Sequence, residues 1–203
     1  MRPSAHPLSH ARWLVLSALL LAGATGIGGC GTRASVTLTS PMTGASLRPN
    51  LVTRVYTAQD ENTVDVYLTD LTPEQLGAPF SEDPGTRPVG QIVHIHMFIR
   101  PSPGKTPIEP QASNCSIRHL ILAPGATGLY GGGGFLLPSG SAASGTFGGS
   151  ISAGTLRLQA STPTFHDALG PTEVRASFRI KESRELALTI ARRLEEASPA
   201  REE

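Results

Sequence analysis

The sequence predicts a mainly β domain, folded as a single antiparallel β-sandwich or partly open barrel of about seven to nine strands, with one amphipathic helix at the C-terminus. Short segments rich in β-branched and aromatic residues follow one another along the chain. Turn-forming residues separate them at intervals of about 8–12 residues, which is typical of all-β domains. Helical patterns do not alternate with the strands, as they would in a parallel α/β fold.

The first strands are expected at 36–39, 51–57 and 63–70. In the third of these, apolar and polar residues alternate strictly, so its apolar side chains share one face of the sheet. The polar run 59–62 joins the second strand to the third, which predicts a β-hairpin. A helical turn at 72–76 follows, because Thr72-Pro73-Glu74-Gln75 has the pattern of a capping box with proline at the first helical position.

The segment 91–100 is the best strand candidate, because it is apolar on both faces and is therefore expected at the centre of the sheet. Its proline-rich neighbour at 101–110 is expected to form a long loop, and the next strand is expected at 116–123. The two faces of 91–100 carry Val93, Ile95, Met97 and Ile99 on one side, and Ile92, His94, His96 and Phe98 on the other.

The stretch 124–154 holds 11 glycines: its single glycines predict turns and bulges, and the four consecutive ones at Gly131–Gly134 predict a flexible run. Only short strands are expected inside it, around 135–137 and at Phe147. Regular strands are expected again at 155–160 and 174–180, the second with alternate residues facing inward. The segment 183–197 predicts a helix with a narrow apolar stripe and with Ser183 as its N-cap. We expect the stripe to pack on the domain's own sheet or against its edge, and the alternative is a helix that binds a partner or a membrane.

The N-terminal 30 residues have the pattern of a secretory signal peptide. Arg2 and Arg12 lie in a stretch without acidic residues, an apolar run follows at 13–22, and small residues lead to Cys30. The tetrapeptide Ile27-Gly28-Gly29-Cys30 resembles the lipobox of bacterial lipoproteins. This resemblance implies a signal peptide at 1–29, acylation of Cys30, a short tether at 30–35 and one β-rich domain at 36–203.

The lipoprotein resemblance also implies a location in the cell envelope. Gly31 after the acylated cysteine is similar to the outer-membrane default of diderm bacteria, so we expect an outer-membrane protein facing the periplasm rather than an inner-membrane one. Removal of the leader leaves 15 basic and 16 acidic residues, and no second basic cluster is visible in the sequence. The lipid on Cys30 is therefore expected to supply the contact with the bilayer alone.

The composition excludes other partners. With 17 basic and 16 acidic residues, the chain lacks the excess of positive charge that nucleic acid requires. The glycine run lacks the Lys-Ser/Thr of a phosphate-binding loop, so no nucleotide is expected.

Acylation of Cys30 would leave Cys115 as the one remaining thiol, which rules out an intramolecular disulfide and favours a buried, inert cysteine.

His94-x-His96 is the strongest candidate for chemistry. On a strand, residues two apart project from the same face about 6.5–7 Å from one another, and two imidazoles at that spacing can bind one transition metal, such as zinc or copper. His119 is the preferred third ligand, because its strand can pair with 91–100. Other candidates are His166, Asp167 and Cys115. The alternative is that both imidazoles lie on a sheet face with ordinary hydrogen-bond partners.

Weaker patterns suggest catalysis. Cys115 with His119 could form a thiol nucleophile and base, and His166-Asp167 with a serine could form a hydrolase triad, but the chain has no Gly-x-Ser-x-Gly elbow. The acidic residues near the hairpin tip at 60–65 lack the spacing of a calcium loop. The sequence therefore predicts a non-enzymatic envelope lipoprotein that binds, assembles or supports an envelope protein partner. The alternative is an extracytoplasmic metal-binding protein or metalloenzyme that uses His94 and His96.

Overall fold

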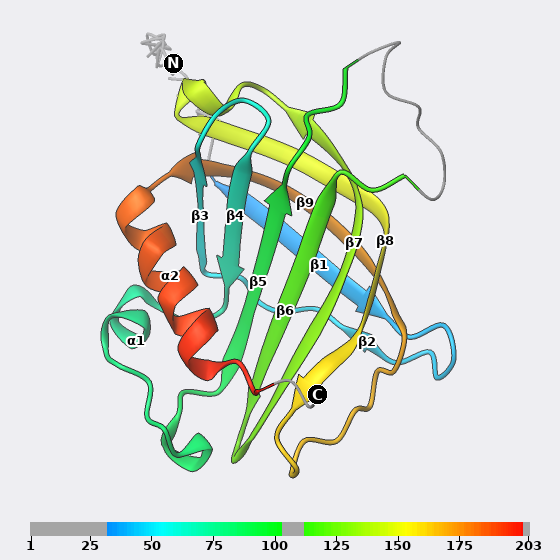
Figure 1. Cartoon of the computed structure of the whole chain (residues 1–203), viewed down its shortest axis with the longest axis vertical. Coiled ribbons are helices and arrows are strands. Elements are labelled where there is room, and N and C mark those ends of the chain that lie inside the picture. Colours follow the sequence, from blue (N-terminus) through cyan, green and yellow to red (C-terminus); the bar gives the residue numbers. More distant parts are fainter. Residues whose placement is uncertain (1–31, 103–111, 201–203) are drawn as a thin grey trace, which may run out of the picture. The chain divides into compact units, whose positions relative to one another are not determined.

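Within the residues that the structure describes, nine strands form one sheet that closes on itself (Figure 1). The computed structural model describes residues 32–102 and 112–200. Within them the elements are β1 (Arg33–Thr39), β2 (Ser46–Leu47), β3 (Thr53–Ala58), β4 (Val64–Thr69), α1 (Pro73–Gly77), a 3-10 turn at Pro84–Thr86, β5 (Gly90–Met97), β6 (Cys115–Ala123), β7 (Ala126–Ser139), a 3-10 turn at Ala142–Ser144, β8 (Thr146–Ser161), β9 (Thr172–Glu182) and α2 (Arg184–Ala197).

The strand order explains the closure. The order is β2-β1-β9-β3-β4-β5-β6-β7-β8, and β8 also pairs with β9, so the seven strands β3 to β9 make a barrel. All pairs are antiparallel except β3 with β9, which share only the parallel register Val55↔Lys181 and Tyr56↔Glu182. This short seam leaves the barrel partly open, and β1 continues the sheet beyond β9 on that side. The predicted fold class, a mainly β partly open barrel with one C-terminal helix, is confirmed.

Side chains fill the inside of the barrel. The alternating residues Val64, Val66 and Leu68 of β4 point inward, and their counterparts on β5 do the same. Three large aromatic residues, Tyr56, Tyr130 and Phe147, are fully buried within the structure. The other inward residues that form this core include Val93, Ile95, Met97, Cys115, Ile117, Leu136, Ile151, Val174, Phe178 and Ile180.

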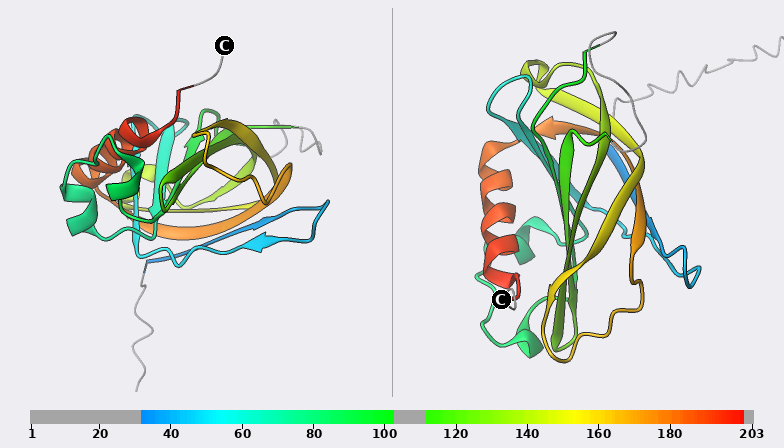
Figure 2. Two further views of the ribbon diagram at one scale, coloured as in Figure 1. Left: turned by 90° about the horizontal axis from the view of Figure 1, so that it is seen from below. Right: turned by 45° about the vertical axis from the view of Figure 1, so that its right-hand side comes forward.

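Helix α2 lies against the outer face of the barrel, as Figure 2 shows from two directions, and a second cluster of buried residues lies between them. Ala187, Ile190 and Leu194 of α2 are buried there against outward residues of β3 to β6. Ser183 caps the helix through its side chain, which accepts a hydrogen bond from the Leu186 amide. The expectations that this helix begins at its Ser183 cap and packs on its own sheet are confirmed.

Other local predictions also hold. The β3–β4 hairpin runs from Thr53↔Thr69 to Ala58↔Val64, and Asp60 closes its turn by accepting hydrogen bonds from two backbone amides. Thr72 and Gln75 form both hydrogen bonds of the capping box at α1. None of the helices in the described ranges is long and apolar enough to cross a membrane.

Three expectations need correction or lie outside the described residues. Residues 33–35, expected as part of a tether, belong to β1 and pair with β9. Strand β5 ends at Met97, three residues earlier than expected, although the Phe98 amide still donates to the Asn114 carbonyl in the β5–β6 register. Residues 103–111, which hold most of the expected proline-rich loop, lie outside the described residues, as do residues 1–31.

The glycine-rich stretch is the main correction. It forms all of β7 and the first part of β8, strands of 14 and 16 residues, rather than turns, a flexible glycine run and short strands. Its glycines allow close packing: a Cβ on Gly132 would lie 1.9 Å from the Thr155 carbonyl oxygen, and one on Gly128 would lie 2.3 Å from the Phe165 ring. Glycine is therefore required here by close approach of backbone and ring, and not by mobility.

Candidate metal centre on the outer face of the barrel

The β4–β5 register brings three polar side chains together. Asp65 is the Cα partner of His96, and Tyr67 is the partner of His94. All four side chains point outward, because the residues that alternate with them on both strands fill the barrel. The predicted histidine pair therefore lies beside a carboxylate that belongs to the neighbouring strand.

The carboxylate of Asp65 joins the two imidazoles. His94 Nε2 and His96 Nδ1 each donate a hydrogen bond of 2.8 Å to the same atom, Asp65 Oδ1. The three potential ligand atoms lie within 4.8 Å of one another. The side chains are 15% (His94), 16% (Asp65) and 33% (His96) exposed, so the cluster is partly shielded but open to solvent.

The surroundings keep Asp65 ionised. Burial by itself would raise the pKa of Asp65, but the hydrogen bonds and charge interactions with His94 and His96 outweigh it, so the pKa is lowered from its ordinary value. Two oxygen–nitrogen contacts thus hold a negative charge between two imidazoles. A carboxylate with two imidazoles is a donor set suited to zinc or copper(II).

Tyr67 fixes the orientation of His94. The two rings stack with centroids 4.5 Å apart and planes only 3° from parallel. Burial and the nearby Asp65 raise the pKa of Tyr67 to about 12, so its hydroxyl remains neutral at physiological pH. Because His94 stacks on this ring, its Nε2 atom is already directed at the carboxylate before any ligand arrives.

A hollow opens beside the cluster. It has a volume of about 330 Å³ and lies where the first half of α2 crosses β3 and β4. Asp65 and Tyr67 form one wall, so a small ligand or water could approach the carboxylate from this side. The remaining lining residues are Thr57, Ala58, Gln59, Arg184, Ala187 and Leu188.

A charged pair borders the cluster on the other side. Arg118 of β6 is the Cα partner of His94, and it forms an ion pair with Glu195 of α2. The hydrogen bond from Arg118 is the largest cause of the lowered pKa of Glu195. The negative charge of Glu195 offsets the positive charge of Arg118 beside His94. Arg118 therefore repels a metal ion at His94 less than an unpaired guanidinium would.

His119 does not join the pair. In the antiparallel β5–β6 register it is the partner of Val93 and therefore points into the barrel, away from the face of His94 and His96. It is completely buried, its Nε2 donates to Gln91 Oε1 at 2.8 Å, and burial lowers its pKa to about 4. His119 therefore does not lie beside the histidine pair, and the third potential ligand atom that the structure brings there belongs to Asp65.

The other candidate residues are also separated from the pair. Cys115 is buried in the barrel core, where burial raises its pKa to about 12 and its thiol donates to the Gly134 carbonyl. Asp167 accepts hydrogen bonds from the Tyr130 hydroxyl and from the amides of Leu169 and Gly170, while His166 is exposed. These contacts serve the local structure, and no serine hydroxyl is bonded to His166 among the described residues.

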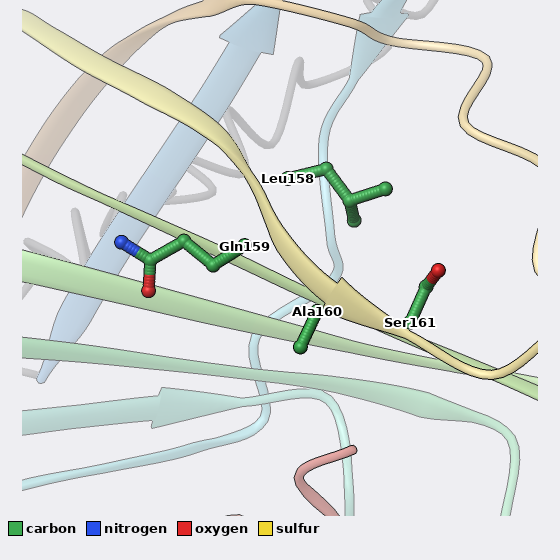
Figure 3. A pocket seen from close by; sticks show the side chains of 4 residues that line it. All are labelled: Leu158, Gln159, Ala160 and Ser161. Carbon is green, nitrogen blue, oxygen red and sulfur yellow. The ribbon is translucent and has the colours of Figure 1, made fainter. Parts of the chain in front are cut away.

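A further hollow on β8 carries no titratable group. It measures about 210 Å³ and is lined by Leu158, Gln159, Ala160 and Ser161 (Figure 3). It lies where the β7–β8 register shifts by one residue, and Gln159 extends over Gly131, which has no side chain in the way. The shape results from a β-bulge.

Asp65 could have been found in the sequence. It alternates with Val64 and Val66, so it lies on the polar face of its strand, and the next long strand along the chain carries the histidines. Consecutive strands usually pair, which would place these polar faces side by side.

No known family model, curated protein or solved structure matches this chain, so the geometry alone must support a function.

Proposed function

We propose that the protein is a lipid-anchored protein of the bacterial cell envelope whose barrel binds a divalent transition metal, zinc or copper(II), through Asp65, His94 and His96. In this proposal it is a binding module and not an enzyme. The observation that carries the metal proposal is the pair of 2.8 Å contacts that direct two imidazole nitrogens at one carboxylate oxygen.

A metal would require the three ligand atoms to rearrange. Ligand atoms about 2.0–2.1 Å from a tetrahedral zinc ion lie about 3.3 Å from one another. The Asp65 oxygen is now 2.8 Å from each nitrogen and would move away by about half an ångström, while the two nitrogens, which lie within 4.8 Å of each other, would approach by up to about 1.5 Å. The ion would replace the two N–H protons that currently hold the nitrogens to the carboxylate.

Three protein ligands would leave one coordination position for water or another small ligand. The hollow beside Asp65 supplies room for it. Because the metal competes with protons for both imidazole nitrogens, its affinity must fall as the pH is lowered. Glu195, whose charge interacts with His94, would support the positive charge without being a ligand.

The lipid anchor rests on the sequence of the leader. The basic, apolar and small-residue segments end at Cys30, as the lipobox resemblance requires. Labelling of cells with radioactive palmitate tests this part: the wild-type chain should be labelled, and the Cys30→Ser variant should not. Label on both chains, or on neither, would contradict the anchor.

Metal titration tests the binding site. The chain, first treated with a chelator, is titrated with Zn²⁺ and Cu²⁺ by calorimetry, and its metal content is measured after dialysis. One ion per chain is expected for the wild type. The variants His94→Ala, His96→Ala and Asp65→Asn should each lose at least about tenfold in affinity, because each removes one of three ligands.

His166→Ala is the matched control, because His166 is an exposed histidine outside the cluster. It should bind metal as the wild type does. Absence of binding in the wild type, or equal loss of affinity in His166→Ala and His94→Ala, would contradict the proposed site. Circular dichroism of each variant separates loss of a ligand from loss of the fold.

A further inference from the structure

The outer face of β1 and β9 gathers four basic residues that are far apart in the sequence. Arg33 of β1 is the Cα partner of Arg179 of β9. Arg175 and Lys181 alternate with Arg179 along β9 and point to the same side, because the residues between them are buried in the barrel core. We call Arg33, Arg175, Arg179 and Lys181 the basic face.

The basic face is exposed, and none of its charges is paired with an acidic side chain within the part of the chain that the structure describes. All four residues are exposed. The ion pairs that the described residues form lie elsewhere, on β4–β5, β6 and α2 and around Arg100. Glu173 is the one acidic residue that shares this face of β9, at its beginning. The net result is a concentrated positive charge on a chain that is nearly neutral overall.

The covalent chain places this face close to Cys30. Arg33 follows Cys30 by three residues, and a chain extends at most about 3.3–3.6 Å per residue. Whatever its conformation, the connection therefore keeps the Cα atom of Arg33 within about 11 Å of that of Cys30. Any surface to which Cys30 is anchored lies within reach of the basic face.

We propose that the basic face lies on the anionic phospholipid headgroups of the bilayer that holds Cys30. This inference rests on the proposed lipid anchor, and it goes beyond it by giving the barrel an orientation. Opposite charge and the short connection both favour this partner. Electrostatic attraction of this kind increases membrane affinity about fivefold per basic residue and is screened by salt.

The orientation has a consequence for the metal centre. In the strand order, β5 is three strands from β9 by way of β3 and four by way of β8, so His94 and His96 lie on the opposite side of the barrel. A barrel resting on its β1–β9 face would hold these residues away from the bilayer. The site would then be accessible to ions or proteins in the surrounding compartment.

Vesicle binding of the mature chain carrying Cys30→Ala tests the inference without the lipid. Co-sedimentation compares vesicles of phosphatidylcholine alone with vesicles that also contain phosphatidylglycerol. We expect binding only to the second kind and its loss at high salt. Replacement of the four residues of the basic face by glutamine should weaken this binding by about a hundredfold or more.

A matched variant keeps the same net charge. Arg184 and Arg192 are exposed arginines of α2, which packs against outward residues of β3 to β6. Their replacement by glutamine should change vesicle binding by less than about threefold, whereas the equally charged double variant Arg175→Gln with Arg179→Gln should weaken it by at least about tenfold. Equal loss in both double variants, or no preference for anionic vesicles, would overturn the inference. Neither outcome would affect palmitate labelling of Cys30, so failure of the basic face and failure of the lipid anchor are distinguishable.

Discussion

His119 and His94 are on neighbouring strands yet have opposite surroundings. His119 points into the barrel, is completely buried and bonds to Gln91. His94 points outward, retains contact with solvent and shares a carboxylate with His96. The comparison teaches that the face of the sheet, and not the residue type, decides whether a histidine stabilises a neutral core or offers a nitrogen to a ligand.

The largest expected effect is a loss of folding stability when a side chain in the barrel core is truncated. Phe147 is fully buried against Tyr56 and Phe178. Phe147→Ala should lower the free energy of unfolding by about 3–5 kcal/mol, because a large cavity remains in a closely packed core. Leu188→Ala on α2, where the side chain is 60% exposed, should cost less than about 0.5 kcal/mol. Urea unfolding of both variants measures the difference, and similar costs would break the contrast between interior and surface.

The second prediction concerns acid and His119. Burial lowers the pKa of His119 to about 4 from an ordinary 6.5. Between pH 6.5 and pH 4 the unfolded chain therefore binds a proton at this residue and the folded chain does not. The free energy of unfolding consequently falls as the pH decreases through this range. The loss attributable to this residue is about 3 kcal/mol. In urea titrations at a series of pH values, the free energy of unfolding of His119→Gln should decline less steeply towards acid than that of the wild type. An unchanged slope would mean that burial does not hold His119 in its neutral form.

The third prediction concerns Asp65 without metal. Its pKa is lowered, so its contribution is present above the ordinary value of 3.8 and is lost as the pH falls through its folded-state pKa. In the presence of a chelator, Asp65→Asn should cost about 1 kcal/mol at neutral pH through weaker hydrogen bonds to the two histidines. The cost should disappear in strong acid, and a cost independent of pH would contradict the ionised carboxylate.

The smallest effect is expected at the edge of the metal centre. Arg118 and Glu195 form an ion pair in which both side chains are partly exposed, 29% and 65%. Arg118→Ala should therefore lower the free energy of unfolding by at most about 1 kcal/mol. The cost should shrink as salt is added. A larger, salt-independent cost would show that the pair holds α2 on the sheet more strongly than its exposure indicates.

Local patterns predicted most elements of the barrel. The β3–β4 hairpin, the capping box at α1, the alternation of β9 and the N-cap of α2 all depend on residues close together in the sequence. Such features follow from local turn chemistry and periodicity. The prediction of which β9 residues face the barrel interior and which face solvent was correct for the same reason.

Features that depend on strand register could not be predicted in the same way. Apolar residues occur on both faces of β6, so its sequence does not show that His119 points inward. The basic face needs the pairing of β1 with β9, which are more than 130 residues apart. The glycine-rich strands were missed because glycine has low strand propensity, and only the close approach at Gly132 explains its presence there.

X-ray diffraction from crystals grown with Zn²⁺, recorded at the zinc absorption edge, tests the central proposal most directly. The account predicts one anomalous peak on the outer face of β4–β5, bonded to Asp65 Oδ1, His94 Nε2 and His96 Nδ1, with His119 still bonded to Gln91. An unaltered hydrogen-bonded cluster with no peak beside it, or a peak only at His166, would contradict a metal centre.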